Sequence, residues 1–226
     1  MKIHLRSALF LLLVGSLAAC SAAQPRSSGI KPGEARQELV EGNQRFLEGG
    51  MRSHAWHDES IMQTGTFGQS PSIGVLSCAD SRVPTEIIFD QGVGDLFVVR
   101  NAGNFRNDSA TGTFEYGVEA LGVHSILVLG HTKCGAVKAT LAGEPLPGHM
   151  SVITAAIQPA LAKMDRTAAS DDENPEPIAA DEANVRWQMK QLIEGSELLQ
   201  KALADGRLTM LGGIYDVETG GVRFLD

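Results

Sequence analysis

Two cysteines and one histidine stand directly after short apolar runs in the sequence. Residues 126–129 (ILVL) are followed, after one glycine, by His131 and Cys134, and residues 72–77 (SIGVLS) are followed at once by Cys78. Apolar runs of this length between turn residues predict buried strands. Ligands of open α/β sheets bind just beyond the carboxyl ends of the strands. We therefore expect the two thiols and the imidazole to lie near one edge of a sheet.

Two cysteines and one histidine match the ligand set of a catalytic zinc site. Structural zinc sites close all four positions with protein ligands, whereas catalytic sites keep one position for water. Soft thiolates also select zinc over magnesium or calcium. Zinc with two thiolates is formally neutral, so its water needs help to lose a proton near neutral pH. Asp80 can accept a hydrogen bond from that water, and Arg82 can keep Asp80 ionised. Alternatively, Asp80 takes the fourth position itself and closes the site.

The same residues also fit two interpretations that involve no catalysis. Cys78 and Cys134 are able to form a disulfide in an oxidising compartment. Asp80 and Arg82, taken alone, are typical of a structural ion pair. Two polar clusters that each follow a buried strand favour the metal site.

The first residues are predicted to be a leader rather than part of the fold. Residues 1–19 combine Lys2 and Arg6 with a short apolar core that ends in small residues before Cys20, as in a signal peptide. The LAAC ending resembles the lipobox of bacterial lipoproteins, so Cys20 is predicted to carry lipid and to anchor the chain without spanning the membrane. An ordinary cleaved signal and an uncleaved anchor are the alternatives. Residues 20–33 are predicted to be a flexible tether.

This leader predicts an exported protein on the periplasmic side of a bacterial membrane, and Ser21 after the lipidated cysteine favours the outer membrane. The net charge of −8 argues against a nucleic-acid partner, because phosphate binding needs a basic face. The sequence after the leader contains no apolar span of about 20 residues, so no later membrane crossing is predicted. Residues 34–226 are long enough for one domain with a sizeable core.

The apolar periodicity predicts an α/β fold with a central, mostly parallel sheet flanked by helices, an N-terminal helical arm and a C-terminal β-hairpin. Strands are expected at residues 72–77, 95–99, 126–129, 208–215 and 222–225. Helices are expected at residues 34–48, 84–89, 111–121, 136–141, 151–164 and 181–204.

Two segments between these elements are predicted to be loops. Residues 51–71 have no clear periodicity, and their His54 and His57 are expected to be solvated or stacked because neither follows a strand. Residues 168–178 contain the acidic run SDDENPEP, which is typical of a solvated loop.

Several stretches resemble the β-class carbonic anhydrases. CADSRVP at residues 78–84 and EYGVEALGVHSILVLGHTKCG at residues 115–135 are similar to the two signature segments of that family. EGNQRF, VVRNAGN and GGIYDVETG extend the resemblance over residues 34–226.

The resemblance implies a zinc lyase that interconverts carbon dioxide and bicarbonate through zinc-bound hydroxide. It implies Cys78, His131 and Cys134 as zinc ligands, and Asp80 with Arg82 as the catalytic pair. Asp80 is also implied as the fourth metal ligand of a closed state. The family forms homodimers, often homotetramers, in which the N-terminal helix wraps over a neighbour.

Two positions bear on subgroup and substrate. Val75 stands where the bicarbonate-regulated subgroup has a tryptophan, which favours a site that stays open. Gln91 is predicted to correspond to a substrate-contacting glutamine donated across the dimer. The alternative functions are hydrolysis of carbon disulfide or carbonyl sulfide at the same site, and a non-catalytic zinc-binding surface lipoprotein.

Overall fold

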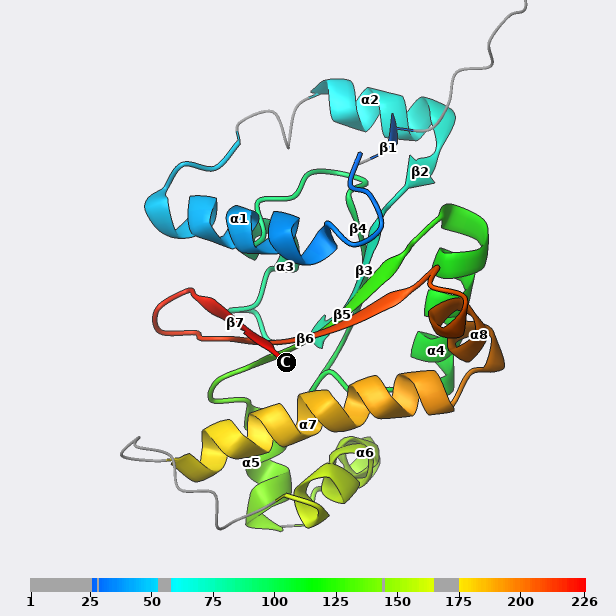
Figure 1. Cartoon of the computed structure of the whole chain (residues 1–226). Coiled ribbons are helices and arrows are strands. Elements are labelled where there is room, and N and C mark those ends of the chain that lie inside the picture. Colours follow the sequence, from blue (N-terminus) through cyan, green and yellow to red (C-terminus); the bar gives the residue numbers. More distant parts are fainter. Residues whose placement is uncertain (1–25, 28, 53–57, 144, 165–174) are drawn as a thin grey trace, which may run out of the picture.

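A five-stranded sheet forms the centre of the computed structural model (Figure 1). The structure describes residues 26–27, 29–52, 58–143, 145–164 and 175–226. The strands are β3 (Ile73–Cys78), β4 (Leu96–Asn101), β5 (Ser125–His131), β6 (Thr209–Tyr215) and β7 (Val222–Leu225). Their order is β4-β3-β5-β6-β7. The first four are parallel and β7 pairs antiparallel with β6, which confirms the predicted parallel sheet and terminal hairpin. A separate short pair joins β1 (Arg26–Ser27) to β2 (Gln69–Ser70).

The register of the sheet brings the polar ends of the strands together. Every residue of β3 and of β5 is buried, as continuous apolar runs in a two-sided parallel sheet require. Cys78 pairs with Asn101 at the end of β4, and His131 pairs with Tyr215 at the end of β6. Both of these strands run further than predicted, so Cys78 and His131 are strand residues rather than the first residues beyond the strands.

Helices cover both faces of the sheet and its carboxyl end. They are α1 (Ala35–Glu48), α2 (Asp58–Phe67), α3 (Thr85–Ile88), α4 (Asp108–Tyr116), α5 (Gly135–Ala142), α6 (Ser151–Ala162), α7 (Pro175–Glu194) and α8 (Glu197–Ala204), with a π-helical turn η2 (Gly117–Leu121) and a 3-10 turn η3 (Gly148–Met150). In Figure 1, α1 and α2 lie on one side of the sheet and α5, α6 and α7 on the other.

Alternating side chains of the central strands build two cores. Leu76, Ile126 and Val128 pack in one core with residues of α4, α7 and α8. Val75, Leu127 and Leu129 pack in the other with residues of α1 and α3. A third cluster contains Cys78 and Cys134 and is closed by α5, α6 and the start of α7.

Three sequence predictions about helices are wrong. The loop expected over residues 51–71 contains α2, while His54 and His57 lie outside the described residues. The acidic loop ends earlier than residue 178, because α7 begins at Pro175. The single helix expected over residues 181–204 is two helices, because Ser196 caps α8 by accepting a hydrogen bond from the Leu199 amide at 3.1 Å.

The N-terminal arm is fastened to its own domain. A Cβ atom on Gly42 would lie 1.9 Å from the Phe89 carbonyl oxygen, so α1 approaches the segment after α3 at a distance that needs glycine. Asn43 donates hydrogen bonds to Ile88 and Gly220 and accepts one from the Val222 amide. These contacts attach α1 to the hairpin at the end of the sheet.

Candidate metal centre

The structure brings Cys78, His131 and Cys134 together at the carboxyl end of the sheet. Their two sulfur atoms and the imidazole nitrogen all lie within 4.8 Å of one another. The three residues are 4%, 1% and 3% exposed, respectively. Two ligands of one tetrahedral zinc lie about 3.3–3.8 Å apart, so shifts of no more than about 1 Å would let all three atoms bind one ion.

The tautomer of His131 is set by its backbone neighbour. Nδ1 lies 2.9 Å from the carbonyl oxygen of Thr132, so Nδ1 carries the proton and donates it. The other nitrogen, Nε2, then presents a lone pair. Within the described part of the chain this buried Nε2 has no hydrogen-bond partner. An unpaired buried nitrogen is costly, and a metal ion bound there would remove the cost.

The two thiols form no disulfide, and their pKa values are shifted in opposite directions. A hydrogen bond from the Cys134 thiol, together with other donors, lowers the pKa of Cys78 to about 4. The same hydrogen bond and burial raise the pKa of Cys134. These opposite shifts favour the thiolate form at Cys78 over that at Cys134. The disulfide alternative is not what the structure contains, and a thiolate beside a bare imidazole nitrogen fits zinc.

Asp80 and Arg82 face each other beside this group. Arg82 donates through Nε to Asp80 Oδ1 at 2.9 Å and through Nη2 to Oδ2 at 2.8 Å, a bidentate pair. This hydrogen bonding lowers the pKa of Asp80 well below its usual range. Asp80 Oδ2 is 3.9 Å from His131 Nε2. Two ligands of one tetrahedral zinc would be about 3.3 Å apart, so Asp80 lies next to the fourth position while bonded to Arg82.

Two arginines fix the turn that carries Asp80. Arg100, on β4, donates to the carbonyl oxygens of Cys78 at 2.8 Å and Asp80 at 2.7 Å. Arg82 reaches across to the Lys133 carbonyl at 3.3 Å, on the loop that leads into Cys134. Hydrogen bonds thus connect the segment of residues 78–82 to the loop that precedes Cys134, so the two sequence motifs lie together as predicted.

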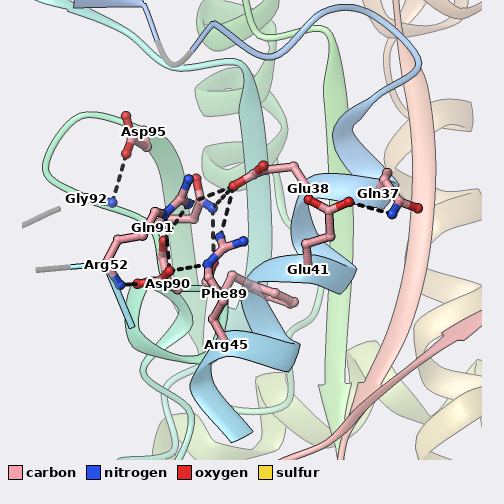
Figure 2. Close-up of polar contacts among 10 residues, drawn as sticks. All are labelled: Gln37, Glu38, Glu41, Arg45, Arg52, Phe89, Asp90, Gln91, Gly92 and Asp95. Atoms are coloured by element: carbon pink, nitrogen blue, oxygen red, sulfur yellow. Dashed lines mark hydrogen bonds and ion pairs between the residues drawn. The ribbon is translucent and has the colours of Figure 1, made fainter. Parts of the chain in front are cut away.

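Gln91 is not brought to this group. Its side chain lies beneath α1 in a cluster of charged residues, where Nε2 donates to Glu38 and to the Phe89 carbonyl, both at 3.0 Å (Figure 2). Arg45 and Arg52 link the same Glu38 to the buried Asp90. Gln91 is 2% exposed, so its proposed role toward substrate remains a prediction. Cys20 lies outside the described residues.

Three polar residues near the group were missed from the sequence: Asp181, Asn184 and Gln188, all buried on α7. Burial raises the pKa of Asp181 to about 8, and its Oδ2 has no hydrogen-bond partner within the described residues. Their spacing of three and four residues places them on one helix face. That spacing was the available signal, but polar residues in a helix are usually exposed.

Comparisons with known proteins agree with this geometry. A family model described as carbonic anhydrase matches residues 73–222. Carbonic anhydrase 2 of Mycobacterium tuberculosis is 35% identical over 195 residues, which is 84% of this chain and 90% of that protein. The carbonic anhydrase of Mycolicibacterium smegmatis is 35% identical over 196 residues, covering 85% and 92%.

A solved structure supports the same relationship. The β-carbonic anhydrase CcaA is 32% identical and superposes with a TM-score of 0.65, over 86% of this chain and 89% of that one. The family match, the relatives and the parallel sheet with a cysteine–histidine–cysteine group at its carboxyl end all agree. The chain belongs to the β-class carbonic anhydrases, the zinc lyases that interconvert carbon dioxide and bicarbonate.

Proposed function

We propose that this chain catalyses the reversible hydration of carbon dioxide, with Cys78, His131 and Cys134 holding zinc and the Asp80–Arg82 pair directing the reacting water. The observation that carries this proposal is the buried cluster of the Cys78 and Cys134 sulfurs with the His131 nitrogen, in which Nε2 of His131 has no geometric hydrogen-bond partner among the described residues. Zinc, when bound, supplies a Lewis acid that makes water acidic near neutral pH.

Asp80 is suited to orient that water. Its carboxylate is ionised because Arg82 holds both of its oxygens, so it accepts a hydrogen bond and donates none. A water that donates one proton to Asp80 keeps a lone pair for the carbon of the substrate. The pairing with Arg82 also opposes movement of Asp80 onto the metal. Together with Val75, it supports a site that stays open.

The test combines metal analysis with stopped-flow carbon dioxide hydration. Wild type should hold one zinc per subunit and be active, whereas Cys78→Ala and Cys134→Ala should lose both zinc and activity. Asp80→Asn should keep zinc and lose most of its activity, since its amide keeps only one of the two accepting oxygens of Asp80 and carries no charge. Asp205→Asn, at an exposed site on the far end of α8, is the matched control. Full activity of Asp80→Asn would contradict the assigned role.

The same preparation tests the alternative functions. Carbon disulfide and carbonyl sulfide are assayed beside carbon dioxide, and faster turnover of either would reassign the substrate. Stoichiometric zinc without turnover of any of the three would support a non-catalytic zinc-binding protein.

We also propose that the chain is exported and anchored through lipid on Cys20. The tether is shorter than the predicted residues 20–33, because Arg26 and Ser27 pair with β2. Among the described residues, none of the helices combines the length and apolar character of a membrane span. Membrane fractionation of wild type and Cys20→Ser tests the anchor: the variant should move to the soluble fraction. Equal membrane retention would rule out Cys20 as the attachment point.

Assembly as a homodimer or homotetramer is proposed from the N-terminal region. Ile61, Met62 and Phe67 on α2 are exposed apolar side chains, as are Val40 and Leu47 on α1. Exposed apolar side chains that gather on surface helices are typical of a protein interface. Sedimentation velocity of wild type and Met62→Asp tests it. A wild-type monomer at micromolar concentration would contradict the proposal.

A further inference from the structure

The Cys78 sulfur accepts a hydrogen bond from the backbone. The amide nitrogen of Gly103, in the turn after β4, lies 3.3 Å from Cys78 Sγ in a buried setting. Gly103 has φ +86°, and a Cβ atom there would lie 2.7 Å from Ile157 Cδ1. Glycine therefore permits both the conformation and the close packing that aim this amide at the sulfur.

The other end of Gly103 is held by a side chain from a distant part of the sequence. Asn184, 1% exposed on α7, donates through Nδ2 to the Gly103 carbonyl oxygen at 2.9 Å. This bond fixes the rotation of the residue whose amide faces Cys78. Asn184 touches neither sulfur nor imidazole in the hydrogen bonds of the described residues, so its effect on the ligand passes through Gly103.

A second amide fixes which way Asn184 points. Gln188 donates through Nε2 to Asn184 Oδ1 at 2.9 Å, and its own Oε1 accepts from the Arg106 amide at 2.8 Å. A backbone amide can only donate, so the Arg106 amide identifies the accepting end of the Gln188 side chain as Oε1. The NH₂ group of Gln188 then faces Asn184, whose accepting oxygen must face Gln188. Asn184 is thereby left with its NH₂ group toward Gly103.

We propose that Asn184 is a positioning residue of the metal centre, which holds Gly103 so that its amide donates to the Cys78 thiolate; this rests on the zinc site proposed above. The N–H···S bond draws charge from the sulfur. With it, the thiolate is stabilised and held in position in its buried pocket, and its electrons are more tightly bound. Outer partners of metal ligands typically change metal affinity or activity by about 10–100-fold.

The test compares Asn184→Ala with a matched variant, Asn43→Ala. Asn43 is also a buried helical asparagine that bonds to backbone groups of other elements, but those groups belong to residues 88, 220 and 222 rather than to a metal ligand's partner. Both substitutions remove similar volume and similar bonds. Folding of each is checked by circular dichroism.

Zinc affinity is measured by competition with a chromophoric chelator, and the sulfur is probed by the thiolate-to-metal charge-transfer band of the Co²⁺-substituted protein. We expect Asn184→Ala to weaken zinc binding at least tenfold and to move the band to lower energy. Asn43→Ala should lower stability and change neither measurement. A zinc affinity within twofold of wild type together with an unmoved band would overturn the proposal.

Gln188→Ala gives a second path to the same answer. It leaves Asn184 present but unoriented, so the band should move in the same direction by a smaller amount. If Asn184→Ala does not fold, an unmoved band in folded Gln188→Ala overturns the proposal. A wild-type protein that binds neither Zn²⁺ nor Co²⁺ would instead overturn the zinc site itself, which separates the two failures.

Discussion

Asp181 offers a sharp test of the electrostatics around the metal centre. Its carboxyl group is 3% exposed on α7, and burial raises its pKa to about 8. The charge of Cys78 raises the pKa further, while that of His131 lowers it. The folded protein is therefore expected to keep Asp181 neutral below about pH 8. Asp181→Asn replaces that neutral acid with a neutral amide of the same shape.

The sign and size of the effect follow from linkage. An unfolded aspartate has a pKa of about 3.9, so between about pH 4 and 8 the unfolded chain releases a proton that the folded protein keeps. Folding stability contributed by Asp181 is complete below the unfolded value and is lost as the pH rises toward 8. Asparagine has no such loss. Each pH unit in this window is worth about 1.4 kcal/mol, so Asp181→Asn should gain about 3 kcal/mol on wild type over two units.

The assay is urea unfolding of wild type and Asp181→Asn at about pH 5.5 and pH 7.5, with zinc saturating in both proteins. Comparing the two proteins at each pH cancels contributions from every other group. Asp216→Asn is the control, because hydrogen bonds, led by the Glu218 amide, lower the pKa of Asp216. Its stabilising contribution is complete above the unfolded pKa and is lost only as the pH falls below it. The effect of Asp216→Asn should therefore be equal at the two pH values.

One result would refute the reasoning. If the free-energy difference between wild type and Asp181→Asn is the same at both pH values, Asp181 is ionised in the folded protein throughout this range. Its burial would then be compensated by a partner.

Two further predictions concern the arm and the open site. Gly42→Ala should lower the free energy of unfolding by about 3 kcal/mol in a urea titration, because the added Cβ would meet the Phe89 carbonyl oxygen at 1.9 Å. Gly50→Ala is the control: its Cβ would meet its nearest atom at 4.0 Å, so the free energy of unfolding should change by less than about 0.5 kcal/mol. Hydration activity should not collapse steeply below about pH 8, because Arg82 holds Asp80 away from the fourth metal position, where a carboxylate would compete with the reacting water; a steep loss in a stopped-flow pH profile would mean that Asp80 reaches the metal.

The strands and the metal group were predictable because one physical rule governs both. The runs IGVL (73–76) and ILVL (126–129) lack the polar alternation of a half-exposed strand, as expected for strands buried on both faces. Parallel strands of one sheet then place their carboxyl ends at the same edge. The break at Ser196 was harder, because apolar periodicity continues across it. One capping hydroxyl decides that boundary, and α2 was missed because its apolar residues face outward rather than toward a core.

The polar face of α7 marks where sequence reasoning stopped. Asn184 and Gln188 are four residues apart, a spacing as typical of an exposed helix face as of a buried one. What makes them part of the metal centre is the Gly103 carbonyl, which lies 81 residues away from Asn184 in the chain. The ligands of this centre can be predicted from motifs because the metal requires those residue types at those strand ends. Its outer hydrogen bonds can be satisfied by any donor that packing brings near, so the residue that supplies one is determined by the fold.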